Sequence, residues 1–446
     1  MIRPFQIRAS VFALLCAWSM AAPAAAADES DAAHPENWSL GVQSTFVVQY
    51  HPAFRSPYHG ANSLDPGSRG DETFDFTIFF GGRLWQGGEA YINPEIDQGF
   101  GLSGTYGAAG FFSGEAYKVG ASRPYVRIPR LFLRQTFDLG GEEQKIEPGP
   151  NQVAASRTAD NIVVTLGKFS VTDIFDTNTY AHDPRADFLN WSVIDAGAFD
   201  YAADSWAYTY GGAVEWTQDW WTWRVGVFDL SRVPNSKFLQ RDFEQFEAVS
   251  EIEARTDIGG QPGKIKLLGY VNRGRMADYS NAVSAAAGSG NPPTLAPVRD
   301  YASRPGVSLN IEQALGANWG AFLRLSADDG SKEAYEFTEI NRSISGGISI
   351  AGALWNRPND RLGFAGVVND LSKSAQSYFA AGGIGLLIGD GALTHYATED
   401  IFEVFYNIAI SEGARIGLDY QFMAHPAYNA DRGPVSAFAL RLHQEI

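Results

Sequence analysis

Apolar and polar residues alternate with a period of two in many short segments after Ser39. In 39–50, the apolar positions are Leu40, Val42, Phe46, Val48 and Tyr50, and the polar positions are Gln43, Thr45 and Gln49. The same alternation returns in 244–255, 317–326 and 414–422. Successive side chains of a strand point to opposite faces of its sheet, so this period predicts many half-buried β-strands.

The contents of the two faces distinguish a soluble sheet from a membrane barrel. The polar face repeatedly carries charges of both signs, as in Glu251, Glu253 and Arg255. The apolar face is expected to end in aromatic residues, namely Tyr50, Trp206, Trp216, Trp221, Trp223 and Tyr420. An apolar outside with aromatic ends and a polar inside is typical of transmembrane barrels, whose closure also removes sheet edges that lipid could not satisfy. We therefore predict an all-β fold, a transmembrane antiparallel β-barrel.

The connections between the segments alternate between short and long. Short turns occur at Gln218-Asp219, 315–317 and 411–413. Long polar or Gly-rich stretches lie near 51–73, 98–124, 169–205, 273–304 and 327–343. Periplasmic turns and outer loops produce this contrast.

The strand count from the sequence needs correction. Reading by eye yields about 17 candidates, whereas a bacterial barrel has an even number of strands. We suspect the region 125–168, because its alternation fails at Arg127 and Pro129. The run Gly383–Gly389 is read as part of a strand, so its glycines are no nucleotide-binding motif, which needs a following helix. The last strand, 434–446, ends on Ile446, where such barrels usually end on an aromatic residue.

The N-terminus has the pattern of a secretory signal. Arg3 and Arg8 precede a short apolar stretch, and 25–27 is a run of small residues before Asp28. We expect a signal peptide at 1–27 and a barrel domain at 28–446, in the outer membrane of a Gram-negative bacterium. Cys16 is the one cysteine and lies in the signal, so the mature protein is expected to have no disulfide.

Charge and spacing argue against several functions. A net charge of −17 disfavours nucleic acid, which requires a basic surface. The seven His residues lack zinc spacing, and Asp173, Asp176 and Asn178 lack the loop of a calcium hand. No metal or other cofactor is expected.

Several motifs resemble one family. They are Phe80–Glu95 (FGGRLWQGGEAYINPE), Gln98–Leu102, Arg130–Gln135, Gly167–Arg185 (GKFSVTDIFDTNTYAHDPR), Phe188–Trp191 and Tyr428–Val435. Together they resemble the carbohydrate-selective porin family typified by OprB, in the expected order over nearly the whole mature chain. The resemblance implies a 16-stranded barrel with a narrowed pore that admits glucose-like sugars.

A sugar-selective pore needs hydrogen-bond donors and acceptors that replace water. The alternation turns several charged residues inward: Arg83, Glu89, Glu95, Asp97, Arg130, Arg134, Glu215, Arg224, Glu247, Arg324, Arg415, Asp419 and Arg441. Arg83, Glu95, Arg130 and Arg134 also lie in the family-like motifs, so we predict them as sugar-binding residues. Pairing across the lumen is the alternative role for each.

The stretch 169–205 is the best candidate for a loop folded into the channel. We predict Asp173, Asp176 and Arg185 in this stretch as further sugar-binding residues. These side chains either line the constriction or attach the loop to the wall, and attachment is slightly favoured.

Other functions and partners stay open at this point. A general or anion-selective porin would use the inward arginines for charged solutes. A barrel enzyme would need a serine beside His395 or His425, and no motif supplies one. The expected partners are small neutral sugars, the lipid bilayer and lipopolysaccharide, with a homotrimer as an open alternative to a single barrel.

Overall fold

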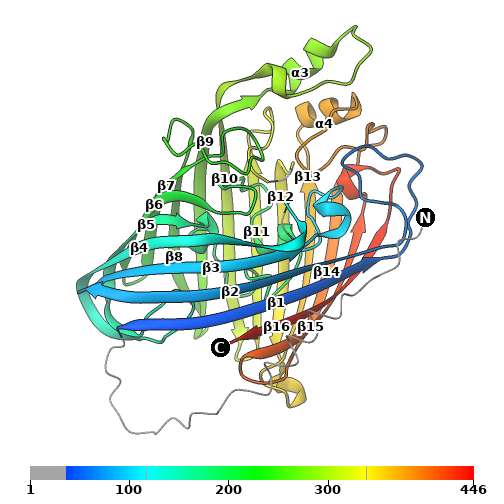
Figure 1. Cartoon of the computed structure of the whole chain (residues 1–446). Helices are drawn as coiled ribbons and strands as arrows, with labels where there is room; N and C mark the ends of the chain where they lie inside the picture. Colours follow the sequence, from blue (N-terminus) through cyan, green and yellow to red (C-terminus); the bar gives the residue numbers. More distant parts are fainter. Residues whose placement is uncertain (1–36, 117, 338) are drawn as a thin grey trace. The chain divides into compact units, whose positions relative to one another are not determined.

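The computed structural model describes residues 37–116, 118–337 and 339–446. These residues form sixteen antiparallel strands in one closed barrel, in which each strand pairs with its sequence neighbours and β1 pairs with β16 (Figure 1). The predicted all-β barrel and the sixteen strands implied by the family resemblance are confirmed, whereas the odd number of strand candidates is wrong.

The barrel is built from strands of unequal length. Their bounds are β1 (Trp38–His51), β2 (Arg69–Trp85), β3 (Gly88–Gly99), β4 (Ala121–Ile146), β5 (Ala155–Phe169), β6 (Thr209–Gln218), β7 (Trp221–Asp229), β8 (Phe246–Ile258), β9 (Gln261–Ala277), β10 (Arg299–Gly316), β11 (Trp319–Asp328), β12 (Arg342–Ala351), β13 (Arg361–Asp370), β14 (Glu399–Ala409), β15 (Ala414–Ala424) and β16 (Val435–Glu445).

The helices are short and lie in the connections. They are α2 (Trp191–Ile194), α3 (Tyr279–Ala286), α4 (Lys373–Ala380) and the 3-10 turns η1 (Leu102–Thr105), η2 (Val171–Asp173), η3 (Ala296–Val298), η4 (Gly352–Trp355) and η5 (Pro426–Tyr428). Within the described ranges, no helix has the length and apolar character needed to cross a membrane.

The alternation read from the sequence separates lumen from lipid. In β1, Thr45 and Gln49 are buried inside the barrel, whereas Leu40 and Tyr50 are exposed on its outer surface. The β1–β16 pairing closes the sheet down to the last residue, since Val42 and Ile446 exchange backbone hydrogen bonds of 3.0 and 2.9 Å. Closure therefore does not require an aromatic residue at this position.

The broken alternation at 125–168 comes from a bulge, and both strands of that region are real. Asn93 pairs with Arg130 and Glu95 with Arg127, so two residues of β4 face one residue of β3. The extra residue shifts the register by one, which brings both arginines to the lumen side.

Two other sequence interpretations are wrong. Trp206 does not end a strand, because it lies in the connection between β5 and β6, where its Nε1 donates to the Tyr125 hydroxyl at 2.9 Å. The run Gly383–Gly389 is not a strand either, since it is an irregular loop after α4. The apolar side chains of that run pack inside the protein, since Leu387 and Ile388 are buried.

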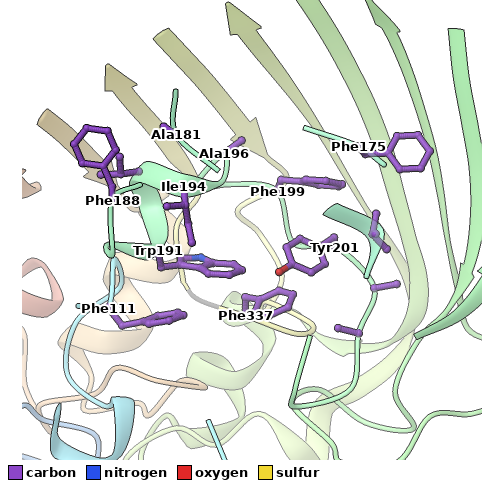
Figure 2. Close-up of a cluster of buried hydrophobic side chains, with 14 of the residues drawn as sticks. Phe111, Phe175, Ala181, Phe188, Trp191, Ile194, Ala196, Phe199, Tyr201 and Phe337 are labelled. Atoms are coloured by element: carbon purple, nitrogen blue, oxygen red, sulfur yellow. The ribbon is translucent and has the colours of Figure 1, made fainter. Parts of the chain in front are cut away.

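The hydrophobic core lies inside the barrel, where outer loops pack on one another. Phe111 stacks on Trp191 with 5.1 Å between ring centroids, and Trp191 stacks on Phe337 at 4.8 Å. Tyr201 lies 4.2 Å from Phe337 (Figure 2). These rings come from three connections, 100–120, 170–208 and 329–341, so the stack joins them into one body within the lumen.

Candidate functional site

Residues 170–208, which we call the lumen loop, are bonded to inward side chains of many strands. Wall carboxylates accept hydrogen bonds from its backbone: Glu247 from Ala202 (2.7 Å), Glu251 from Asp176 (2.9 Å) and Glu403 from Asn190 (3.1 Å). Because β8 and β14 both hold this loop, it crosses the interior of the barrel. The predicted folding of 169–205 into the channel is in agreement with this arrangement.

Wall arginines bind the same loop through its carbonyl oxygens. Arg324 in β11 donates from Nη1 to Val193 and from Nη2 to Ala181, both at 2.8 Å. Arg441 in β16 donates from Nη2 to the carbonyl oxygen of Asp187 at 3.0 Å. These inward arginines hold the loop backbone, a role that the sequence pattern did not distinguish from lining the pore.

A cavity of about 490 Å³ remains between the lumen loop and the barrel wall. Among the predicted residues, Arg130, Arg134, Asp173 and Arg185 line it. Its wall also includes Phe111, Glu115, Lys118, His182, Trp191, Asp195, Tyr201, Trp206, Tyr208 and Phe337. Arg83, Glu95 and Asp176 do not line this cavity.

Arg130 and Asp173 form a two-point contact between wall and loop. Arg130 Nε donates to Asp173 Oδ2 at 2.8 Å, and Nη2 donates to Oδ1 at 2.6 Å. The guanidinium also lies 5.0 Å from the ring centroid of Tyr208. This planar, doubly bonded arrangement fixes the guanidinium at the cavity wall.

Arg134 and Arg83 occupy different environments. Arg134 lines the cavity, donates from Nη1 to the carbonyl oxygen of Asn151 at 2.8 Å, and lies 5.2 Å from the ring centroid of Tyr91. Arg83 donates from Nη2 to the carbonyl oxygen of Ala154 at 2.9 Å, in the connection between β4 and β5.

Glu95 belongs to the barrel wall. It is buried, accepts from Thr77 Oγ1 at 2.6 Å and pairs with Arg127 at 2.5 Å. Arg127 also pairs with Asp97. Arg127 was not predicted as a site residue, and the bulge in β4 is what brings it to this side.

Asp176 attaches the lumen loop to the wall. Its carboxylate accepts from Asn310 Nδ2 at 2.8 Å and from the backbone N–H of Ala196 at 2.7 Å, and it lies 3.3 Å from Arg324 Nε. Attachment, the slightly favoured expectation for this loop's polar residues, is the arrangement at Asp176.

Arg185 reaches the cavity from the loop. Its Nη1 lies 3.3 Å from Glu115 Oε1 in the 100–120 connection, and its Nε lies 3.9 Å from Asp75 Oδ1 in β2. Glu115 was not predicted, because nothing in its local sequence indicates that its loop enters the lumen.

Burial changes the protonation of several loop groups at the cavity. Burial, together with the negative charge of Asp176, raises the pKa of Asp195 to about 8. Burial also lowers the pKa of Lys118 to about 8, and burial and the Arg324 guanidinium lower the pKa of His182. Burial alone would raise the pKa of Asp173, but the Arg130 guanidinium outweighs it and holds the pKa below its usual value. Near pH 7, Asp195 and His182 are therefore mostly uncharged.

The arrangement suits binding of a polar, uncharged solute during passage. Side-chain donors and acceptors line the cavity together with aromatic rings. Across the described ranges, no group of His, Cys, Asp and Glu side chains is arranged to hold a metal ion.

Comparison with known proteins gives one family and several structures with the same fold. A family model described as "Carbohydrate-selective porin, OprB family" matches residues 61–445. The high-pH structure of Pseudomonas putida OprB matches with a TM-score of 0.68 and 14% identity, over 92% of this chain and 94% of that one. The outer membrane channel DcaP of Acinetobacter baumannii matches with a TM-score of 0.50 and 9% identity, over 92% and 97%. A search of curated protein sequences found no match.

Proposed function

The chain belongs to the carbohydrate-selective porin family, and from that membership we propose that small neutral sugars bind in its lumen cavity as they diffuse through the outer membrane. Glucose is the representative solute. The observation that carries the proposal is the cavity of about 490 Å³ between the lumen loop and the wall, lined by both donors and acceptors.

We assign direct sugar contact to the predicted residues that line the cavity, Arg130, Arg134, Asp173 and Arg185. Guanidinium groups donate to hydroxyl oxygens and carboxylates accept from hydroxyl protons. Arg83, Glu95 and Asp176 act indirectly, by holding the wall and the lumen loop in place. The predicted residues therefore fall into two groups, one that contacts the sugar and one that holds the wall and the lumen loop.

Sugar transport is favoured over selective passage of anions by the way the arginines are neutralised. Arg130 is paired with Asp173 at 2.6 Å, and Arg185 lies 3.3 Å from Glu115. A guanidinium that is paired with a carboxylate attracts anions less strongly than an unpaired one. An anion-selective channel would instead need a field of uncompensated positive charge.

A barrel enzyme is not supported by the two histidines considered for it. His395 Nδ1 lies 2.9 Å from Asp431 Oδ1, and His425 Nδ1 lies 2.9 Å from the carbonyl oxygen of Thr398. Neither imidazole is hydrogen-bonded to a serine hydroxyl in the parts of the chain that the structure describes. Members of this family act as channels, and a catalytic site would need such a serine.

Export and assembly extend the proposal. Residues 1–27, which lie outside the described residues, act as a cleaved signal. The exposed apolar outer face of the barrel contacts lipid and lipopolysaccharide. An outer groove of about 730 Å³, lined by Trp220, Trp221, Trp223, Leu267 and Val307 among others, offers a contact for a second barrel in a homotrimer. Mass measurement of the detergent-solubilised protein and N-terminal sequencing test these two points.

Liposome swelling tests the proposed function directly. Proteoliposomes should swell in isotonic glucose much faster than protein-free liposomes, and faster than in a disaccharide of the same osmolality. Equal swelling rates for proteoliposomes and empty liposomes in every sugar would contradict the proposal. A strong chloride preference with no sugar-dependent change in current would favour the anion-selective alternative.

A further inference from the structure

Two side chains at the cavity each carry one buried polar atom that has no hydrogen-bond partner. Asp195, which caps the C-terminus of α2, and His182 both line the cavity. His182 Nδ1 lies 3.7 Å from Asp195 Oδ1, which is beyond hydrogen-bond distance, and both atoms are buried without a partner. Asp195 is only 4% exposed, so its carboxyl group is almost entirely removed from solvent.

One wall residue fixes the two segments that carry these side chains. Arg324 donates to the carbonyl oxygen of Ala181, directly before His182, and to that of Val193, two residues before Asp195. The N–H of Ala196, directly after Asp195, donates to the Asp176 carboxylate at 2.7 Å. The backbone on both sides of the pair is therefore fixed.

The aromatic stack adds rigidity on the other side. Asp195 donates its backbone N–H to the carbonyl oxygen of Trp191 at 3.2 Å, and the Trp191 ring is stacked between Phe111 and Phe337. Figure 2 shows these rings packed beside the short helix that precedes Asp195. Pre-organised polar groups lose little freedom when a ligand binds, which favours affinity.

Buried polar atoms in native proteins almost always have partners, so two such atoms beside one cavity, His182 Nδ1 and Asp195 Oδ1, point to a ligand that supplies the partners. Resting on the proposed function, we propose that Asp195 and His182 form a subsite for the hydroxyl groups of a neutral sugar in the lumen cavity.

The chemistry of the pair matches an uncharged hydroxyl compound. A protonated carboxyl group and a neutral imidazole each offer one donor and at least one acceptor, as a sugar hydroxyl does. The raised pKa of Asp195 and the lowered pKa of His182 keep both groups in these forms near pH 7. The cavity volume of about 490 Å³ lies in the usual range of small-molecule sites.

The test is a titration of single-channel current with glucose, using Asp195→Ala and His182→Ala. Each variant should raise the half-blocking glucose concentration about three- to tenfold, the range for loss of one neutral hydrogen bond. Asp195→Asn keeps a donor and an acceptor, so it should lie closer to wild type than Asp195→Ala. A control is Asp138→Asn, which changes a carboxylate outside the cavity that accepts from the Thr158 N–H at 2.9 Å; its current should be blocked by glucose as in wild type.

A panel of monodeoxyglucoses identifies the contact. One deoxy sugar should bind the wild-type channel more weakly than glucose does, because it lacks the hydroxyl that contacts Asp195. The same deoxy sugar should bind Asp195→Ala about as tightly as glucose binds this variant. Wild-type block in both alanine variants, each migrating as a folded barrel, overturns the subsite but leaves the proposed function standing. A wild-type channel that no sugar blocks overturns the proposed function, and the subsite with it.

Discussion

Arg130 in β4 holds Asp173 of the lumen loop through two parallel hydrogen bonds, from Nε to Oδ2 at 2.8 Å and from Nη2 to Oδ1 at 2.6 Å. The pair links the barrel wall to the loop that narrows it. Nη1 of Arg130 donates to the Tyr208 hydroxyl at 3.5 Å, the limit of hydrogen-bond distance. A sugar hydroxyl can therefore bind this guanidinium without breaking the pair.

Replacing Arg130 should weaken sugar binding. In Arg130→Ala, we expect the half-blocking glucose concentration to rise about tenfold, because a hydrogen bond from a charged group is lost. Arg130→Lys should restore only part of the affinity, since an ammonium group lacks the planar fork. Arg83→Ala, outside the cavity, is the comparison and should raise the concentration much less than Arg130→Ala, because Arg83 acts only indirectly.

The buried arginine that anchors the lumen loop should dominate stability. Arg324→Met leaves the buried Asp176 carboxylate without its cationic partner, and breaking such a pair costs about 3–5 kcal/mol. We expect the folded band to convert to the unfolded band at a lower temperature in SDS electrophoresis, and the open-channel current to become noisier. Arg342→Met removes a pair with Asp370 in which the arginine side chain is 66% exposed, so it should cost no more than about 1 kcal/mol. Equal melting of the two variants would show that the buried contacts do not anchor the loop.

The ion selectivity should depend on pH. Between pH 6 and pH 9, Asp195 gains a negative charge and Lys118 loses a positive one, because both groups have a pKa of about 8. Both changes make the cavity wall more negative, so the reversal potential in a KCl gradient should shift towards cation preference. The shift should be smaller in Asp195→Asn/Lys118→Met, and groups such as Glu339, whose pKa burial raises to about 7, should account for the remainder. A full shift in that double variant would assign the effect to other groups.

Trp206 should affect sugar passage, whereas the aromatic residues at the ends of strands, such as Trp216, should not. It lines the cavity, where its ring can contact the apolar face of a pyranose. We expect Trp206→Ala to raise the half-blocking glucose concentration about threefold. Trp216→Ala, on the outer surface, is the comparison and should leave the concentration unchanged. The reverse ranking would place the sugar path elsewhere.

The barrel could be predicted from the sequence because successive residues of a barrel strand face the lumen and the lipid in turn. Each short segment therefore contains the pattern of both environments. Alternation in β1, β8, β11 and β15 identified which residues face the lumen, and long polar stretches identified most outer loops. The period failed at the β4 bulge, where one extra residue reverses the alternation between Arg127 and Arg130. A bulge of this kind depends on how two strands pair, so the sequence of one strand does not show where it lies.

The candidate site was predicted only in part, because it depends on contacts between loops. Asp173 and Arg185 were found since their loop is long, polar and part of a motif. The sequence did not predict a role at the cavity for Glu115, Asp195 and Phe337. These residues come from three different connections, which meet only in the folded barrel. Trp206 was placed on the outside because an aromatic residue near a strand end has the same local pattern on either surface.

The most direct test of the central claim, that sugars bind between the lumen loop and the wall, is the glucose dependence of single-channel current in wild type and Arg130→Ala. The account predicts saturable block of the wild-type current, with a half-blocking concentration about tenfold lower than in the variant. A current that falls only in proportion to solution viscosity, identically in both proteins, would contradict it.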